Sequence, residues 1–295
     1  KSGGIIPMES AKHHKEVSEK IYLEALEKAN ISEEKITAIA ISNAPGLAPC
    51  LHEGMNFAKS ISRKLKVPMI PVNHCVAHLE IGQSVGAKDP VLLYASGANT
   101  QIIAYAAGKY RVFGETLDIG VGNFIDKVAR YMGMGFPGGP KIEQKAVGGK
   151  YLELPYSIKG MDVSFSGLQT KIQNLYDKKI SINDLTYSLQ ETAFSMLVEA
   201  SERALAHTGK KELVLGGGVA CNSRLQEMCK IMCAERKAKY FCPEKPLLVD
   251  NAAMIAFTGE IMFKAGIKET PETIQVKPRE RTDDVKIVWR NEPKQ

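Results

Sequence analysis

The sequence lacks several patterns that assign a protein to a class at once. Its six cysteines form no Cys-x-x-Cys pair, which argues against a zinc ribbon and against a thioredoxin-type redox site. No apolar run approaches the ~20 residues of a membrane-spanning helix, Lys1 to Glu9 contain no apolar stretch of the signal-peptide kind, and no segment is of low complexity. With the irregular cysteine spacing, these absences predict a cytoplasmic protein that has no membrane role.

What the sequence does have is an ordinary globular composition. Its 295 residues are 44% hydrophobic and 24% charged, which allows a sizeable core in one large or two medium domains. The formal net charge of +6 permits an anionic partner such as RNA. Lysine and arginine occur in short scattered runs, however, and these suit solvated helix faces equally well.

The apolar periodicity predicts the same plan in both halves of the chain. A helix, a buried strand, a glycine-bearing loop, a second helix, a short strand and the start of a third helix follow one another twice. In the first half we expect the first five elements at about 13–29, 36–41, 43–49, up to 65, and 69–72. In the second half we expect them at about 183–207, 212–215, 216–218, up to 235, and 240–242, with a last helix from Asp250. Ser10 is a plausible N-cap of the first helix.

This alternation of strands and helices predicts parallel α/β sheets, in which ligands bind beyond the carboxyl ends of the strands. His74 follows such an end in the first half, and Asp250 follows the corresponding end in the second. If the two halves face each other, these two residues converge on one cleft.

The second half also opens with three strands, at about 91–95, 101–106 and 110–116, which have no counterpart in the first half. We therefore expect about three further strands, roughly 30 residues, upstream of Lys1. The predicted lobes are 1–88 and 89–270, the second with an ordered, turn-rich insertion at 133–167. Residues 271–295 are expected to return to the first lobe.

The segment His74-Cys75-Val76-Ala77-His78 carries two imidazoles four residues apart. On a helix they lie on one face, within reach of a single metal ion; the alternative is two unrelated polar residues at a helix start. The zincin motif H-E-x-x-H is absent, because Cys75 stands where its glutamate would be. Asp250 is either a helix N-cap or, by the symmetry of the halves, a third ligand. A His/His/carboxylate set with open positions suits iron or zinc acting as a Lewis acid.

Two loops of the second half could bind an anion. Gly217 and Gly218 lie between a strand and a helix, where glycine lets a ligand approach the backbone and the helix N-terminus favours negative charge. Close helix–strand packing would demand glycine there as well. The small hydroxylated turn within Tyr94–Thr100 could cup a phosphate through its N–H groups, or be an ordinary hairpin turn.

Three polar residues stand near these loops in the sequence. Asn222 could contact a ribose or a base. Asp126 lies about one turn inside a helix, where a solvated aspartate is the plain alternative. Glu143 falls near the start of a short helix, and interaction with the helix dipole is its simplest role.

Together these segments closely resemble one family, the tRNA N6-threonylcarbamoyladenosine synthases. This family comprises the KEOPS catalytic subunit of archaea and eukaryotes and TsaD of bacteria, formerly described as O-sialoglycoprotein endopeptidases. Asn73–Glu80 and Phe113–Asp118 are similar to the archaeal-eukaryotic branch. The matching stretches are 73–82, 94–101, 113–126, 137–143, 161–168, 216–224 and 250–256.

The resemblance implies an actin-like fold (ASKHA, ribonuclease H-like) of two related lobes, with the first strands of lobe one missing from this chain. It implies one divalent metal ion, iron or zinc, held by His74, His78 and Asp250, with Tyr94 close to the ion or ligating it. It also implies an ATP- or AMP-type nucleotide, as part of the substrate or as ligand. The residues implied in binding it are Tyr94, Ala95, Ser96, Gly97, Ala98, Asp126, Gly139, Glu143 and Asn222.

The implied reaction is the metal-assisted transfer of threonylcarbamoyl from its adenylate to N6 of tRNA adenosine 37, next to the anticodon. The implied partners are tRNA, a kinase-like ATPase subunit, a small dimerising subunit and at least one further KEOPS subunit. Some archaeal genes fuse the kinase behind this domain, and the polar end Arg290–Gln295 could lead into such a fusion.

Three alternatives to the transferase remain. An ATPase or small-molecule kinase of the same fold would use carboxylates with magnesium rather than histidines. A metallopeptidase would have to find its general base elsewhere. A non-catalytic scaffold would bind tRNA and partner subunits without transferring anything.

Overall fold

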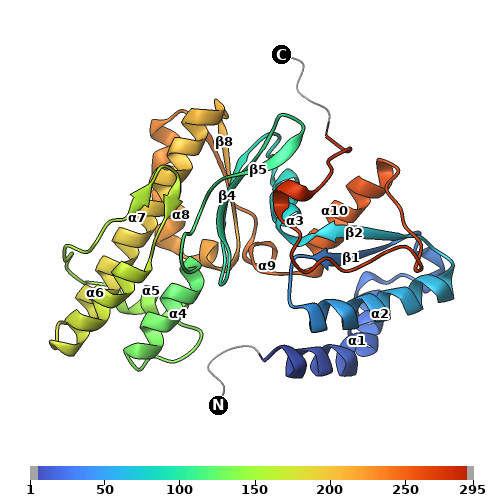
Figure 1. The fold of residues 1–295 in the computed structure, drawn as a ribbon, viewed down its shortest axis with the longest axis horizontal. Coiled ribbons are helices and arrows are strands. Elements are labelled where there is room, and N and C mark those ends of the chain that lie inside the picture. Colours follow the sequence, from blue (N-terminus) through green and yellow to red (C-terminus); the bar gives the residue numbers. More distant parts are fainter. Residues whose placement is uncertain (1–5, 291–295) are drawn as a thin grey trace. The chain divides into compact units, whose positions relative to one another are not determined.

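Two main sheets, each with its own core, organise the chain in the computed structural model, which describes residues 6–290 (Figure 1). One unit comprises the described residues of 1–80 and 252–295, and the other comprises residues 81–251. The units are defined by their internal contacts, and the predicted lobe limits of 1–88 and 89–270 stay a prediction. The end of the chain was considered above as a connection to a fused kinase domain. Its residues 291–295 lie outside the described residues.

The first unit is built on a parallel pair of strands connected through a helix. Its longer elements are α1 (Pro7–Ala29), β1 (Ile39–Ala44), α2 (Ala48–Leu65), β2 (Met69–Asn73), α3 (His74–Glu80) and α10 (Ala252–Lys264). Helix α1 lies along α2, and α10 contacts β1, β2 and α3. Met55, Ala58, Met69 and Ile274 form the buried apolar cluster of this unit.

Two boundaries in this unit differ from the sequence prediction. Helix α1 begins at Pro7, and its N-cap is Ile6, so the prediction of Ser10 as the cap was wrong. Proline suits the first helical position, because its φ is already helical and its missing N–H would have had no partner there. Strand β1 begins at Ile39 rather than at residue 36, because the chain first makes a 3-10 turn at Glu33–Lys35 and pairs with β2 only from Ile39 onward.

The second unit contains a five-stranded sheet in the order β5-β4-β3-β8-β9. Its strands are β3 (Val91–Ala95), β4 (Thr100–Ala106), β5 (Lys109–Glu115), β8 (Glu212–Gly216) and β9 (Lys239–Phe241). Strands β3, β4 and β5 are antiparallel neighbours, whereas β3, β8 and β9 run parallel. Every residue of β3 is buried, as expected for a central strand whose two faces are covered.

The helices of the second unit pack against this sheet and contribute most of the residues of its buried apolar cluster. They are α4 (Val121–Tyr131), α5 (Gly139–Lys145), α6 (Ser166–Asp177), α7 (Ile182–Thr208), α8 (Ser223–Glu235) and α9 (Lys245–Leu248). The connection β8–α8–β9 repeats the connection β1–α2–β2 of the first unit, each joining two parallel strands through one helix. This confirms the repeated strand–helix–strand step that the sequence predicted.

Short elements complete the description. They are the 3-10 turns at Glu33–Lys35, Ile81–Val85, Gly218–Cys221 and Thr282–Asp284, and the hairpin strands β6 (Ile158–Lys159) and β7 (Asp162–Val163). Helix α5 and this hairpin lie within the predicted insertion 133–167, which is ordered. Among residues 6–290, no helix combines the length and the apolar character needed to cross a membrane.

The carboxylate of Asp118 helps to fasten the end of the insertion to the sheet. Asp118 accepts hydrogen bonds from the backbone N–H groups of Phe165 and Ser166, at the N-terminus of α6, and from that of Ile119. Partial burial opposes the charge on Asp118, but these three N–H groups outweigh it and hold the pKa of the carboxyl below its usual range. Asp118 therefore acts as an ionised cap that ties α6 to the end of β5.

Candidate functional site

The histidine pair lies on helix α3, directly after strand β2. The ring centroids of His74 and His78 are 4.8 Å apart, with the ring planes inclined by 82°. His78 is fully buried and His74 is half-buried. Cys75, Val76, Ala77 and Leu79 of the same helix are buried apolar residues. The expectation that the spacing of four brings both imidazoles to one side of a helix is confirmed.

The start of α3 is fixed by a side chain that the sequence analysis did not single out. The side-chain oxygen of Asn73 accepts hydrogen bonds from the N–H groups of Cys75 (3.1 Å) and Val76 (3.3 Å). It caps the helix and satisfies two N–H groups that have no partner within the helix. Asparagine before a helical segment is a usual cap signal, so the sequence could have shown it.

The end of α3 is fixed by residues that are distant in the sequence. Glu80 is fully buried, and its carboxylate accepts hydrogen bonds from Trp289 and Arg290. The separation of 209 and 210 residues leaves no local pattern that would reveal this contact.

Asp250 belongs to the second unit and is exposed. Helix α10 begins at Ala252, so Asn251 directly precedes it, and Asp250 lies one residue too early to be its N-cap. That disfavours the plain alternative for Asp250.

The donor set fits a transition metal. Each of His74, His78 and Asp250 can offer one ligand atom, an imidazole nitrogen or a carboxylate oxygen. Iron and zinc accept such mixed nitrogen and oxygen ligands, whereas magnesium and calcium prefer oxygen throughout. Tyr94, the fourth residue in the implied set, is buried at the carboxyl end of β3 in the second unit.

The turn after β3 is held firmly in place. Ser96 closes it through its hydroxyl group, which donates to the carbonyl of Asn99. In the first turn of α4, the N–H groups of Gly122 and Asn123 donate to the carbonyls of Ser96 (3.0 Å) and Gly97 (2.9 Å). The turn is therefore part of the framework, while its tip at Gly97 and Ala98 is exposed.

The loop after β8 meets this turn at close range. Gly217 has φ +90°, and a Cβ atom there would lie 2.3 Å from the carbonyl oxygen of Ala95. Only glycine permits this approach of two backbones. Gly218 follows on the exposed side. Thus the close-packing explanation holds for Gly217, and the carboxyl ends of β3 and β8 present adjacent loops of exposed backbone.

Three further predicted nucleotide residues, Asp126, Glu143 and Asn222, have framework contacts. Asp126 accepts a hydrogen bond from the N–H of Gly138 (2.7 Å), which fixes the start of α5 at Gly139. Glu143 accepts from the N–H of Ser223 (2.8 Å), at the start of α8. Glu143 thus serves the dipole of α8, not that of its own helix.

Asn222 is the N-cap of α8 and is buried. Its side-chain oxygen accepts from the N–H groups of Arg224 (2.9 Å) and Leu225 (3.2 Å), and its side-chain nitrogen donates to Gln190 (2.7 Å). Asp126, Glu143 and Asn222 therefore join α4, α5, α7 and α8 around the two loops. Their role in nucleotide binding stays a prediction.

The cysteines of this unit are inert thiols. Cys229 and Cys233 are buried in its core, and burial raises the pKa of both thiols, that of Cys233 to about 11. Neutral thiols at pH 7 are neither good nucleophiles nor good metal ligands. Cys229 and Cys233 therefore serve as small apolar side chains of the core.

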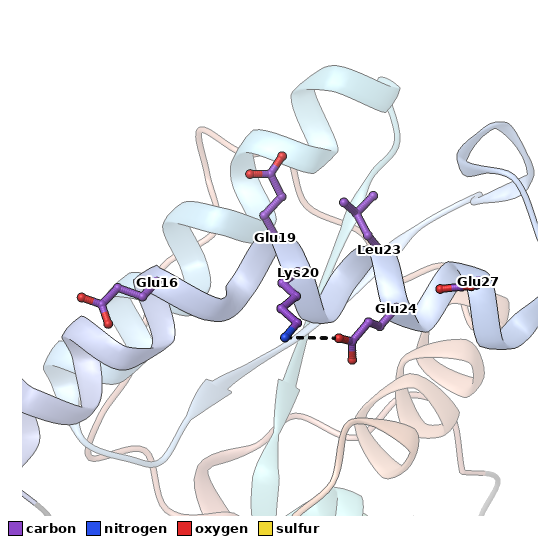
Figure 2. A pocket seen from close by; sticks show the side chains of 6 residues that line it. All are labelled: Glu16, Glu19, Lys20, Leu23, Glu24 and Glu27. Atoms are coloured by element: carbon purple, nitrogen blue, oxygen red, sulfur yellow. Dashed lines mark ion pairs between the residues drawn. The ribbon is translucent and has the colours of Figure 1, made fainter.

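Figure 2 shows a shallow depression whose lining comes from α1 alone. It consists of Glu16, Glu19, Lys20, Leu23, Glu24 and Glu27. Lys20 and Glu24 form an exposed ion pair at 3.8 Å. Such pairs are usual on a solvated helix face, so this depression is not a candidate active site.

Comparison with known proteins identifies the family of this chain. A family model described as TsaD, tRNA N6-adenosine threonylcarbamoyltransferase, matches residues 1–257. A tRNA N6-adenosine threonylcarbamoyltransferase from Thermococcus kodakarensis is 53% identical over 289 residues, which cover 97% of this chain and 89% of the relative.

A second relative is longer. A probable bifunctional tRNA threonylcarbamoyladenosine biosynthesis protein from Methanosarcina barkeri is 52% identical, and the match covers 99% of this chain but 54% of that protein. This chain thus spans about half the length of that bifunctional relative.

Among solved structures, full-length HypF in its phosphate- and nucleotide-bound form is similar with a TM-score of 0.64 and 14% sequence identity. The match covers 82% of this chain and 49% of HypF. At this identity the likeness concerns the fold alone, and it confirms the expected actin-like α/β class.

Proposed function

Because this chain belongs to the tRNA N6-adenosine threonylcarbamoyltransferase family, we propose that it transfers threonylcarbamoyl from threonylcarbamoyl-AMP to N6 of tRNA adenosine 37, next to the anticodon. The chain is a transferase of tRNA modification. The observation that carries the proposal beyond the family is the pair of adjacent imidazoles on the buried helix α3, which a kinase of this fold has no need of.

The proposed metal ligands are His74, His78 and Asp250, with Tyr94 beside them. The donor types favour iron or zinc. When bound, the ion would supply Lewis-acid polarisation to an oxygen of the mixed anhydride. His78 is fully buried, which suits a ligand whose ring orientation must be fixed by its surroundings.

The proposed adenylate site lies at the carboxyl ends of β3 and β8. The exposed backbone at Gly97, Ala98 and Gly218 would bind the phosphate through N–H groups. The other members of the proposed site are Tyr94, Ala95, Ser96, Asp126, Gly139, Glu143, Gly217 and Asn222. Asp126, Glu143 and Asn222 would act mainly by holding the loops in place, since their side chains already bond to the framework.

The proposed chemistry is an acyl transfer. The N6 amine of adenine attacks the carbonyl carbon of threonylcarbamoyl-AMP and forms the new N–C bond. The bond between that carbon and the phosphate oxygen breaks, AMP departs, and the amine releases one proton to solvent. Backbone N–H groups aimed at the departing phosphate would stabilise the charge that develops on it.

The proposed partners are tRNA, a kinase-like ATPase, a small dimerising subunit and a further subunit, as in a KEOPS complex. The bifunctional relatives support association with a second activity, because this chain matches about half of each. The formal charge of +6 suits an RNA substrate. We also propose that the protein acts in the cytoplasm, where its tRNA substrate is found.

The decisive assay supplies threonylcarbamoyl-AMP, tRNA and partner subunits to the purified chain and measures N6-threonylcarbamoyladenosine by mass spectrometry of nucleosides. We expect the modified nucleoside with the wild-type chain and none with His78→Ala. His52→Ala is the matched control, since His52 is exposed on α2 of the same unit. Product formation by His78→Ala at the wild-type rate would refute the role of the metal, and absence of product from the wild type would refute the transferase.

A further inference from the structure

Helix α3 carries both histidines, yet it has only seven residues. A helix this short is not stable in isolation, because the free energy gained from two helical turns is smaller than the free-energy cost of helix nucleation. The positions of the two imidazoles must therefore depend on contacts between α3 and residues outside the helix.

The amino end of α3 is held in place by a hydrogen bond to Glu280. Asn73, which caps the helix, is buried, and its side-chain nitrogen donates a hydrogen bond to the carboxylate of Glu280 (3.3 Å). Glu280 is itself oriented by Lys277 (2.8 Å). The cap is thus held from both sides, by the helix N–H groups and by Glu280.

The carboxyl end of α3 is held in place by hydrogen bonds from Trp289 and Arg290. The Glu80 carboxylate accepts from Trp289 Nε1 (2.7 Å), from Arg290 Nε (3.0 Å) and from Arg290 Nη2 (2.9 Å). A negative charge at the carboxyl end of a helix opposes the helix dipole, and a fully buried one also loses its hydration. Glu80 is tolerated there because three N–H groups surround it, and those groups fix its position.

The segment that supplies these groups is itself anchored to the same unit. The N–H of Lys277 donates to the carbonyl of Asn43 (2.8 Å), and the N–H of Gly46 donates to that of Pro278 (3.2 Å). Thr282 and Ile274 are buried. The segment therefore links the end of β1 to both ends of α3.

We propose, on the basis of the metal site proposed above, that Glu280, Trp289 and Arg290 form a clamp that positions α3, and that this clamp sets how tightly His74 and His78 hold their metal ion. The three residues are positioning residues, since they act through Asn73 and Glu80. Groups that orient metal ligands from behind change metal affinity on the order of 10–100-fold when they are removed.

The test is a titration of the metal-free chain with Co²⁺ alone. It reports the affinity and, by the visible absorption band of the bound Co²⁺, the geometry of the ligands. We expect Arg290→Gln to weaken Co²⁺ binding by about 10–100-fold and to alter the band. Arg290→Lys keeps the charge and one donor, so it should recover part of the affinity. Trp289→Phe removes one N–H group and keeps an aromatic ring at this position. It provides the same test of the clamp if Arg290→Gln does not fold.

Two controls separate positioning from stability and from charge. Lys286→Gln removes one positive charge from an exposed position of the same segment, and Co²⁺ affinity should not change. Ile274→Val loosens the buried cluster under the segment, so it should lower the melting temperature and leave Co²⁺ affinity as it was. In the absence of any metal, hydrogen exchange of residues 73–80 should be faster in Arg290→Gln than in Lys286→Gln.

Each result has one meaning. Unchanged Co²⁺ affinity and band in both Arg290→Gln and Trp289→Phe would overturn the clamp, and so would weakening by Ile274→Val in proportion to its loss of stability. If His78→Ala binds Co²⁺ as tightly as the wild type, the proposed metal site fails, and the clamp with it. Loss of binding in His78→Ala with no effect of the clamp variants would leave the metal site standing and remove only the clamp.

Discussion

Asp118 offers a quantitative test of how the second unit is held together. Its carboxylate accepts from Phe165 N–H (3.0 Å), Ser166 N–H (2.8 Å) and Ile119 N–H (2.6 Å). Asp118→Ala removes the cap of α6, and loss of such a cap costs about 0.5–2 kcal/mol. For a unit of this size that corresponds to a drop in melting temperature of roughly 1–8 °C. Asp118→Asn keeps one acceptor oxygen and should lose less.

The pH dependence follows from the direction of the pKa shift. The pKa of Asp118 is lower in the folded chain than in the unfolded chain, so the unfolded state binds a proton first as the solution is acidified. The stabilisation is fully present above the unfolded pKa of about 3.9 and is lost as pH falls through the folded pKa. The difference between wild type and Asp118→Ala should thus be constant from about pH 7 to pH 5 and shrink below about pH 4.

Urea denaturation of both proteins at several pH values measures this difference directly. Glu235→Ala, at an exposed position of the same unit, is the control and should show no such pH dependence. A difference near zero at pH 7, or one that persists unchanged at pH 3, would refute the account of Asp118 as an ionised cap.

Three further predictions concern the loops and the core. Asn222→Ala should destabilise the chain by about 1 kcal/mol or more, measured by thermal unfolding, because α8 loses its N-cap; unchanged stability would contradict this. Gly217→Ala should reduce both stability and nucleotide binding, read by unfolding and by calorimetry with AMP, because its Cβ would collide with Ala95; a variant like wild type in both would count against the close approach. Cys229 and Cys233 should resist a thiol reagent at pH 7 in the folded chain and react after denaturation, since burial keeps them protonated; rapid reaction in the folded chain would be inconsistent with this.

The sequence predicted most of the fold because each element carried its own periodicity. The residues from 91 to 95 form an uninterrupted apolar run, and they are the buried central strand. The start of β1 was missed by three residues, since pairing with β2 and not local preference sets it. Ser10 failed as a cap because a proline at the first helical position outweighs a serine three residues later.

The site was predictable where spacing alone decides. The separation of four between His74 and His78 suffices to bring their rings together. The hydrogen-bond partners of Asn222 and Glu143 were harder to predict, because these partners, Gln190 and Ser223, lie on other helices. The contact of Glu80 with Arg290 could not be predicted from the sequence, because it forms between residues that are far apart along the chain.

The most direct measurement of the central claim is the metal content of the purified chain, determined by elemental analysis for the wild type, His78→Ala and Asp250→Asn. We expect about one iron or zinc ion per wild-type chain and a marked loss of the ion in both variants. An Asp250→Asn chain that retains the full wild-type content would contradict the proposal that one carboxylate and two imidazoles share a single ion.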